Sequence, residues 1–144
     1  MERLVLVLTF PRSGGAAWAA RRRVAHVALR FAASLELSAI SPRSPRADEP
    51  NFDLAREAGD SISVAEIKST TPKNEERQLR LGLGQVLRYR QLLEGKHRRV
   101  VRAVLVAERR PCDESWRDLC GQLAVLFTTP DEFGGRPWTE THPV

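Results

Sequence analysis

The spacing of apolar residues over the first fifty positions predicts one helix and little other regular structure. Residues 16–35 carry apolar side chains at helical intervals after the chain-breaking Pro-Arg-Ser-Gly-Gly segment at 11–15, so a helix is expected there. Residues 35–40 alternate and predict a short strand, whereas 41–50, with three prolines, predict a loop or an unpaired crossing. The apolar run 4–10 is too short to span a bilayer, so we interpret it as a strand or a frayed end and expect no membrane association.

The alternation of apolar and polar residues becomes regular from position 51 and predicts a β-hairpin. Residues 51–57 and 61–68 have the pattern of two strands, and the Gly59-Asp60 pair between them is a turn sequence. If these two residues form the whole loop, residues whose numbers sum to 119 are paired, and Asp53 lies opposite Glu66. The hairpin therefore brings two distant acids together.

Beyond the hairpin the chain alternates between helical and strand patterns. A helix is expected from about 75 to 94, ending near Gly95, and the nearly continuous apolar run 100–107 predicts a strand covered on both faces. Residues up to 122 then predict a second helix that Asp113 caps, and 123–128 predict a last strand.

These elements together predict a single α/β domain. A chain of 144 residues is long enough for one hydrophobic core, which we place at about 16–128, with peripheral or flexible ends at 1–15 and 129–144. The expected order, αβββαβαβ, gives a central mixed sheet of about four to five strands flanked by helices.

Three residues interrupt the pattern of the helix expected at 75–94. Gly82 and Gly84 each cost about 1 kcal/mol relative to alanine, which indicates a close approach of the backbone to a packing partner or to a phosphate. Arg90 falls on the apolar face, so either the helix turns outward there or the side chain extends its charge into solvent.

The predicted hairpin also predicts a cation site. Paired residues have Cβ atoms about 5 Å apart, and Lys68 lies on the same face as Glu66. Two carboxylates at that distance repel each other by roughly 3 kcal/mol at an effective dielectric of about 20, and a cation would compensate. Oxygen ligands without histidine or thiolate favour Mg²⁺ or Mn²⁺. The expected ligands of the ion are the carboxylates of Asp53 and Glu66, with the carbonyl of Ile67 as a further one.

A simpler interpretation of Asp53, Glu66 and Lys68 is a solvent-facing charge ladder in which the lysine pairs with one acid. Against it, Ile62 and Val64 share their face of the strand, so that face is expected to be partly covered.

The same residues resemble the core of the PD-(D/E)xK nuclease superfamily. Asn51-Phe52-Asp53-Leu54 supplies the first acid, and Val64-Ala65-Glu66-Ile67-Lys68-Ser69 supplies the second acid and the lysine. The segment Gln85-Val86-Leu87-Arg88-Tyr89 on the following helix is similar to the QxxxY element of the RecB-like branch. The resemblance covers about 51–107, and fits loosely to 128. It departs from the family at the first helix, where many members carry an acid or a histidine and this chain has Arg21, Arg22 and Arg23, then His26, with Glu36 only near the end.

The resemblance implies a restriction-endonuclease-like fold and metal-dependent hydrolysis of phosphodiester bonds. Asp53 and Glu66 would hold Mg²⁺, and Lys68 would orient the attacking water or neutralise the developing anion. Gln85 and Tyr89 would position the substrate strand or the metal shell.

The charge of the chain adds a partner to this picture. Lysine and arginine number 23 against 18 acids, a net charge of +5, which favours nucleic acid, with DNA expected before RNA. Arg77, Arg80 and Arg88 could contact phosphates, or be ordinary solvated charges on a helix. The small size suggests a homodimer or a larger repair or defence complex, and the two cysteines fit a cytoplasmic protein.

Two other functions fit the same sequence. One is a catalytically inactive nucleic-acid-binding or scaffolding subunit with the same fold. The other is an unrelated basic interaction protein with a fortuitous motif, which predicts that the hairpin register is wrong and that Asp53 and Glu66 lie on opposite faces of the sheet.

Overall fold

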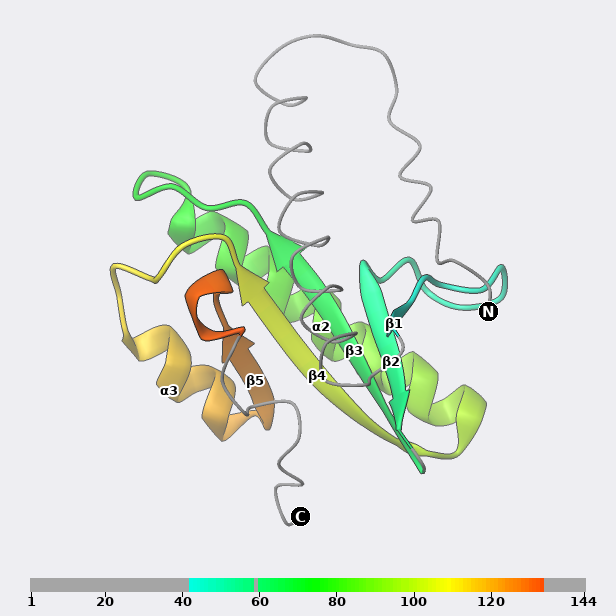
Figure 1. The fold of residues 1–144 in the computed structure, drawn as a ribbon. Coiled ribbons are helices and arrows are strands. Elements are labelled where there is room, and N and C mark those ends of the chain that lie inside the picture. The colour runs from blue at the N-terminus through cyan, green and yellow to red at the C-terminus, as the bar shows by residue number, and fades with distance from the viewer. Residues whose placement is uncertain (1–41, 59, 134–144) are drawn as a thin grey trace, which may run out of the picture.

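The protein is an α/β protein built on a mixed sheet, seen in a computed structural model that describes residues 42–58 and 60–133 (Figure 1). The sheet has five strands in chain order: β1 (Pro42–Arg43), β2 (Leu54–Ala58), β3 (Ser61–Lys68), β4 (Val100–Ala107) and β5 (Val125–Thr128). β1, β2 and β3 pair antiparallel, whereas β3, β4 and β5 pair parallel. The predicted strand 4–10, helix 16–35 and strand 35–40 lie outside the described residues.

Two helices make the parallel connections and pack against the same face of the sheet. α2 (Glu75–His97) joins β3 to β4 and runs along the sheet, and α3 (Ser115–Gln122) joins β4 to β5 (Figure 1). Both helices belong to one hydrophobic core, into which alternate residues of β3, β4 and β5 also project. Its members on the helices are Leu79, Leu83, Val86, Leu93, Trp116 and Cys120, and those on these strands are Ile62, Val64, Val101, Ala103, Leu105, Ala107, Val125 and Phe127.

The opposite face of the sheet is also buried at its centre. Leu54, Ile67 and Val106 expose 2% or less of their surface, and Val104 exposes 2%. Burial on both faces confirms what the continuous apolar run 100–107 predicts for β4, whose bounds also agree with the prediction.

The proline-rich segment 41–50 is not wholly a loop. Pro42 and Arg43 pair with β2 as a two-residue strand at the edge of the described sheet, and proline is tolerated at such an edge. Arg43 also donates two hydrogen bonds to buried Glu49, at 2.6 and 2.9 Å. The expectation of an unpaired crossing was therefore wrong at this point.

Helix α2 runs one turn further than its sequence predicts. It passes through Gly95 and ends at His97, and Arg98 then adopts the left-handed conformation with a φ of 51°. Contacts with the segment before β2 accompany this last turn, because Lys96 forms an ion pair with Asp48 and His97 Nε2 lies 2.9 Å from Glu49 Oε2. These tertiary contacts outweigh the preference of Gly95 for a helix end.

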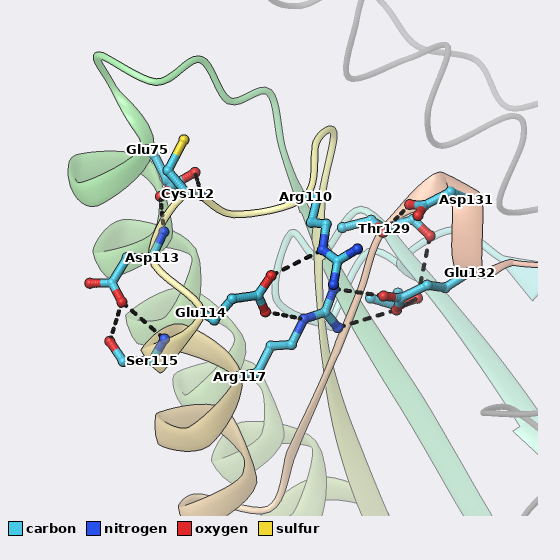
Figure 2. A network of polar contacts seen from close by, with 11 residues as sticks. Glu75, Arg110, Cys112, Asp113, Glu114, Ser115, Arg117, Thr129, Asp131 and Glu132 are labelled. Atoms are coloured by element: carbon cyan, nitrogen blue, oxygen red, sulfur yellow. Dashed lines mark hydrogen bonds and ion pairs between the residues drawn. The ribbon is translucent and has the colours of Figure 1, made fainter.

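Polar contacts fix the first turns of both helices. The Glu75 carboxylate accepts hydrogen bonds from the backbone N–H groups of Cys112 and Asp113, which ties the start of α2 to the loop before α3 (Figure 2). Asp113 accepts hydrogen bonds from the backbone and hydroxyl of Ser115, so it serves the start of α3 as predicted, although the helix begins two residues later. The ends of these elements are thus held by side chains as well as by the core.

Beyond β5, an ion-pair network joins α3 to the short 3₁₀ helix η1 (Pro130–Glu132). Arg117 lies between Glu114 and Glu132, with nitrogen–oxygen distances of 3.1 and 2.6 Å (Figure 2). Its guanidinium lies 5.0 Å from the centre of the Phe127 ring. Arg110 pairs with the other side of Glu114 at 3.0 Å. Within 42–58 and 60–133, neither α2 nor α3 combines the length and the apolar character needed to cross a bilayer.

Candidate active site

The hairpin has the register that the two-residue turn predicts. Leu54 pairs with Ala65 and Ala58 pairs with Ser61, so paired residue numbers sum to 119 along the whole of β2. The regular pairing begins at Leu54, three residues later than the predicted start of the strand. Asp53 is therefore just outside the ladder, beside the end of β2.

The Asp53 side chain replaces the backbone of β2 at this point. Its Oδ2 accepts a hydrogen bond from the N–H of Ile67 at 2.7 Å, and its own N–H donates to Ala65 at 3.2 Å. The Phe52 N–H, which a continued ladder would offer to the Ile67 carbonyl, donates instead to Pro50 at 2.9 Å. The chain thus turns at residues 50–52, just before it begins to pair with β3, and the sequence signal for this turn was the proline itself.

The Ile67 carbonyl points to the side of β3 on which Asp53 lies. In a strand the N–H and C=O of one residue point to the same side, and the Ile67 N–H points to Asp53. The next carbonyl, that of Lys68, points to the other side, where it accepts from Glu108. A backbone oxygen is thus on the same side of the strand as the aspartate, which is compatible with the predicted ligand role of Ile67.

Glu66 and Lys68 form a buried ion pair on the helix-covered face of β3. Lys68 Nζ lies 3.2 Å from Glu66 Oε1, and the two side chains expose only 12% and 6% of their surface. Burial and, after it, the neighbouring Asp53 carboxylate raise the pKa of Glu66 to about 8, against the opposing effect of Lys68. The ion pair matches half of the charge-ladder interpretation, but the solvent exposure that a ladder requires is missing.

The pKa of Asp53 is also raised. Burial of the carboxyl is the main cause, and the Ile67 hydrogen bond and the charge of Lys68 act against it. The Asp53 charge makes ionisation of Glu66 harder, so the predicted repulsion between the two acids is present. The alternative with Asp53 and Glu66 on opposite faces is contradicted by this register and by their electrostatic interaction.

Gln85 and Tyr89 lie on the flank of α2 next to the two acids. Burial raises the pKa of Tyr89, and so do the charges of Glu66 and Asp53, whereas a hydrogen bond with the Gln85 side chain lowers it. The two residues are one helical turn apart and therefore share this flank. The structure thus brings the QxxxY pair to the acids and the lysine.

Two buried oxygen atoms at this site have no hydrogen-bond partner among the described residues: Oε2 of Glu66 and Oε1 of Gln85. A buried acceptor without a partner costs about 1–3 kcal/mol, so such atoms are rare unless a ligand, water or ion meets them. A cation is a suitable partner because it satisfies oxygen acceptors only.

The residues present fit a hard divalent cation. In 42–58 and 60–133, no three histidine, cysteine, aspartate or glutamate side chains come together as a metal cluster, so a site made of side chains alone would have only Asp53 and Glu66. With the Ile67 carbonyl this is an all-oxygen set of three protein atoms. Mg²⁺ is commonly held by one or two carboxylates and keeps waters and substrate phosphate as its other ligands.

The predicted phosphate-binding arginines do not converge on these residues. Arg77, Arg80 and Arg88 are exposed on α2. Arg80 bonds within its own helix to Glu76, and Arg88 donates to Gln91 at 2.6 Å. At 100° per residue Arg80 lies on the far side of the helix from Gln85 and Tyr89, whereas Arg77 and Arg88 lie on the outer, solvent side next to that flank.

The remaining irregular positions of α2 have separate explanations. Gly82 makes the close approach that the sequence predicts, because an added Cβ would lie 2.9 Å from Cγ of Lys68, whereas Gly84 has nothing within 4 Å. The sequence indicated a close approach but not its partner. Arg90 extends from the apolar face and donates to the carbonyls of Leu123 and Ala124 at the end of α3, at 3.0–3.1 Å.

The site thus consists of two acids with raised pKa values, one lysine, one directed carbonyl and an amide–phenol pair. Comparison of the chain with models of protein families, with curated proteins and with solved structures finds no match.

Proposed function

We propose that the protein is a Mg²⁺-dependent nuclease, with a restriction-endonuclease-like core, that hydrolyses phosphodiester bonds in nucleic acid. The observation that carries the proposal is the convergence, at the open end of one hairpin, of Asp53, Lys68 and Glu66, whose buried Oε2 has no partner among the described residues. A structural ion pair would need one acid and one lysine. The second acid, Asp53, accepts the Ile67 N–H but also adds repulsion, which a bound cation would relieve.

Asp53, Glu66 and the Ile67 carbonyl are the residues that would hold Mg²⁺. The ion would supply Lewis acidity toward a phosphate oxygen and a lower pKa for a bound water. Because the pKa of Glu66 is raised to about 8, protons compete with the metal for this acid, so metal affinity should rise with pH.

The residues of the chain itself have distinct roles in this proposal. Lys68 places a positive charge 3.2 Å from Glu66, where it can hold the attacking water or stabilise charge that develops on the phosphate. Gln85 and Tyr89 offer an unpaired amide oxygen and a phenol beside the acids, which suits contacts with a sugar or with waters of the metal. The net charge of +5 favours a polyanionic substrate, and we take DNA as the first candidate.

The test is cleavage of single-stranded, duplex and branched DNA and of RNA, with Mg²⁺, Mn²⁺ or EDTA. Lys68→Met should lower the cleavage rate by roughly 10²–10⁴-fold, the range for loss of a positioned acid–base or charge-stabilising group, while the fold is retained. Lys96→Met is the matched control, because this exposed lysine pairs with Asp48 near the C-terminal end of α2, away from the site.

Asp53→Asn completes the test at the metal. It should abolish Mg²⁺-dependent cleavage and weaken Mn²⁺ binding measured by calorimetry. Undiminished cutting by either site variant would remove the proposed chemistry. A wild-type protein that binds DNA but neither Mn²⁺ nor Mg²⁺ would instead favour the non-catalytic binding subunit.

A further inference from the structure

The stem of Lys68 passes directly beneath a glycine of α2. A Cβ built on Gly82 would lie 2.9 Å from Cγ and 3.3 Å from Cε of Lys68, and 2.7 Å from Cδ1 of Leu105. Real Cβ atoms essentially never approach another heavy atom more closely than 3.0 Å. The lysine and the helix backbone are therefore in contact at a place where only glycine fits.

The two neighbours of Gly82 differ in how easily they can move. Leu105 is on β4, fully buried in the core between the helix and the sheet, and close-packed side chains cannot yield without a shift of their surroundings. Lys68 is at the last position of β3, and its flexible stem can take another rotamer and swing toward solvent. A methyl group at position 82 would thus displace the lysine stem, while its clash with Leu105 would lower the stability of the fold.

We infer that Gly82 is a positioning residue: because it has no side chain, the stem of Lys68 can pass beside it and reach Glu66. The ammonium group ends 3.2 Å from Oε1 of Glu66 because the stem lies flat between α2 and β3. The catalytic meaning of this arrangement rests on the proposed function. The arrangement itself does not, and it can be tested separately.

Gly84 provides a comparison within the same helix. It is exposed, and an added Cβ would meet nothing within 4 Å. Alanine should therefore be favourable there through its higher helix propensity, and Gly84→Ala serves as the matched control. Both glycines lie within the same helix and differ only in the side chains packed against them.

The experiment uses Gly82→Ala, Gly84→Ala, Lys68→Ala and two double variants in the full chain. Crystal structures of the glycine variants give the separation of Lys68 Nζ from Glu66 Oε1. Urea denaturation gives the midpoint of unfolding, and steady-state cleavage gives kcat and KM. The double variant Gly82→Ala with Leu105→Val removes the Cδ1 clash but leaves the clash with Lys68.

In the expected result, Gly82→Ala moves Nζ out of hydrogen-bond range of Glu66 and lowers kcat at least tenfold with KM unchanged, and Gly84→Ala does neither. Leu105→Val should restore the midpoint of the Gly82→Ala protein without restoring kcat. In the Lys68→Ala background, Gly82→Ala should cause no further loss of kcat and a smaller midpoint shift, because the stem that it would displace has been removed.

Two outcomes would overturn the inference. An intact Lys68–Glu66 pair in the Gly82→Ala structure would show that the methyl group does not displace the lysine. Full recovery of kcat by Leu105→Val would assign the effect to packing of the helix alone. If the wild-type protein cleaves no substrate, the proposed function fails by itself, and the Nζ–Oε1 separation and the midpoint shifts still decide the role of Gly82.

Discussion

Replacing Glu66 with glutamine should remove most of the change in the free energy of unfolding between pH 4.5 and about 8. The pKa of Glu66 rises from an ordinary 4.5 to about 8 because the carboxyl is buried beside Asp53. The folded protein therefore binds a proton that the unfolded chain has lost. The stabilisation that this bound proton gives is complete below pH 4.5 and is lost as the pH rises through about 8.

The size of this effect follows from the two pKa values. Between 4.5 and about 8, each step of one in pKa corresponds to about 1.4 kcal/mol, so the free energy of unfolding should fall by up to ~5 kcal/mol. Stabilities of single domains are about 5–15 kcal/mol, so this is a large part of the total. Glutamine keeps the shape and remains neutral, and should make the protein several kcal/mol more stable than wild type near pH 9.

The measurement is urea denaturation in EDTA across that pH range, for wild type and for Glu66→Gln. Glu94→Gln, at an exposed glutamate of α2, is the matched control and should follow the wild-type curve. Addition of Mg²⁺ near pH 9 should then stabilise wild type and not Glu66→Gln, by about 2.7 kcal/mol when Mg²⁺ is present at a hundred times its Kd.

Parallel curves for wild type and Glu66→Gln would refute this reasoning. They would mean that Glu66 ionises in the folded protein as easily as in the unfolded chain. A metal site at these acids would then lose its main electrostatic support.

Two further predictions concern the frame around the site. Arg90→Met removes the hydrogen bonds to the Leu123 and Ala124 carbonyls and should cost about 1–2 kcal/mol in urea denaturation, with faster amide exchange in α3 and unchanged exchange in β3 as the internal control. Glu49→Gln should cost about 3 kcal/mol at pH 7, because buried Glu49 holds Arg43, and should flatten the acid limb of the stability curve. Hydrogen bonding from Arg43 lowers the pKa of Glu49, so its stabilisation is lost as pH falls below 4.5, and an unchanged acid limb in the variant would contradict this assignment.

The hairpin and the central strand could be predicted because local chemistry determines them. The Gly59-Asp60 sequence predicts a two-residue turn, and the register of β2 against β3 that such a turn requires is the one the structure has. The apolar run of β4 has the same bounds in the sequence and in the structure, since burial on both faces requires such a run.

The errors occurred where distant residues decide the outcome. The edge strand β1 exists because β2 is available beside it, and α2 passes Gly95 because Asp48 and Glu49 contact its last turn. The start of β5 is two residues later than predicted, where Ala124 has a φ of 53°. None of these partners can be identified from the period of the local sequence.

The candidate site shows the same division. The placement of the acids and Lys68 followed from strand geometry, and that of Gln85 and Tyr89 from their shared helix flank. The direction of the Ile67 carbonyl depends on Phe52 turning toward Pro50, and the contact of Gly82 with Lys68 depends on how closely α2 approaches the sheet. Distances of this kind arise from packing, which a one-dimensional pattern does not encode.

The order of the strands has a consequence for how the protein is made. In the described sheet each strand lies next to the one that precedes it in the chain. During synthesis, the partner of every newly emerged strand has therefore already left the ribosome, and short loop closures carry a smaller entropic cost than long ones. The sheet can grow from β1 toward β5 as translation proceeds, without an early strand waiting exposed for a partner from the far end of the chain.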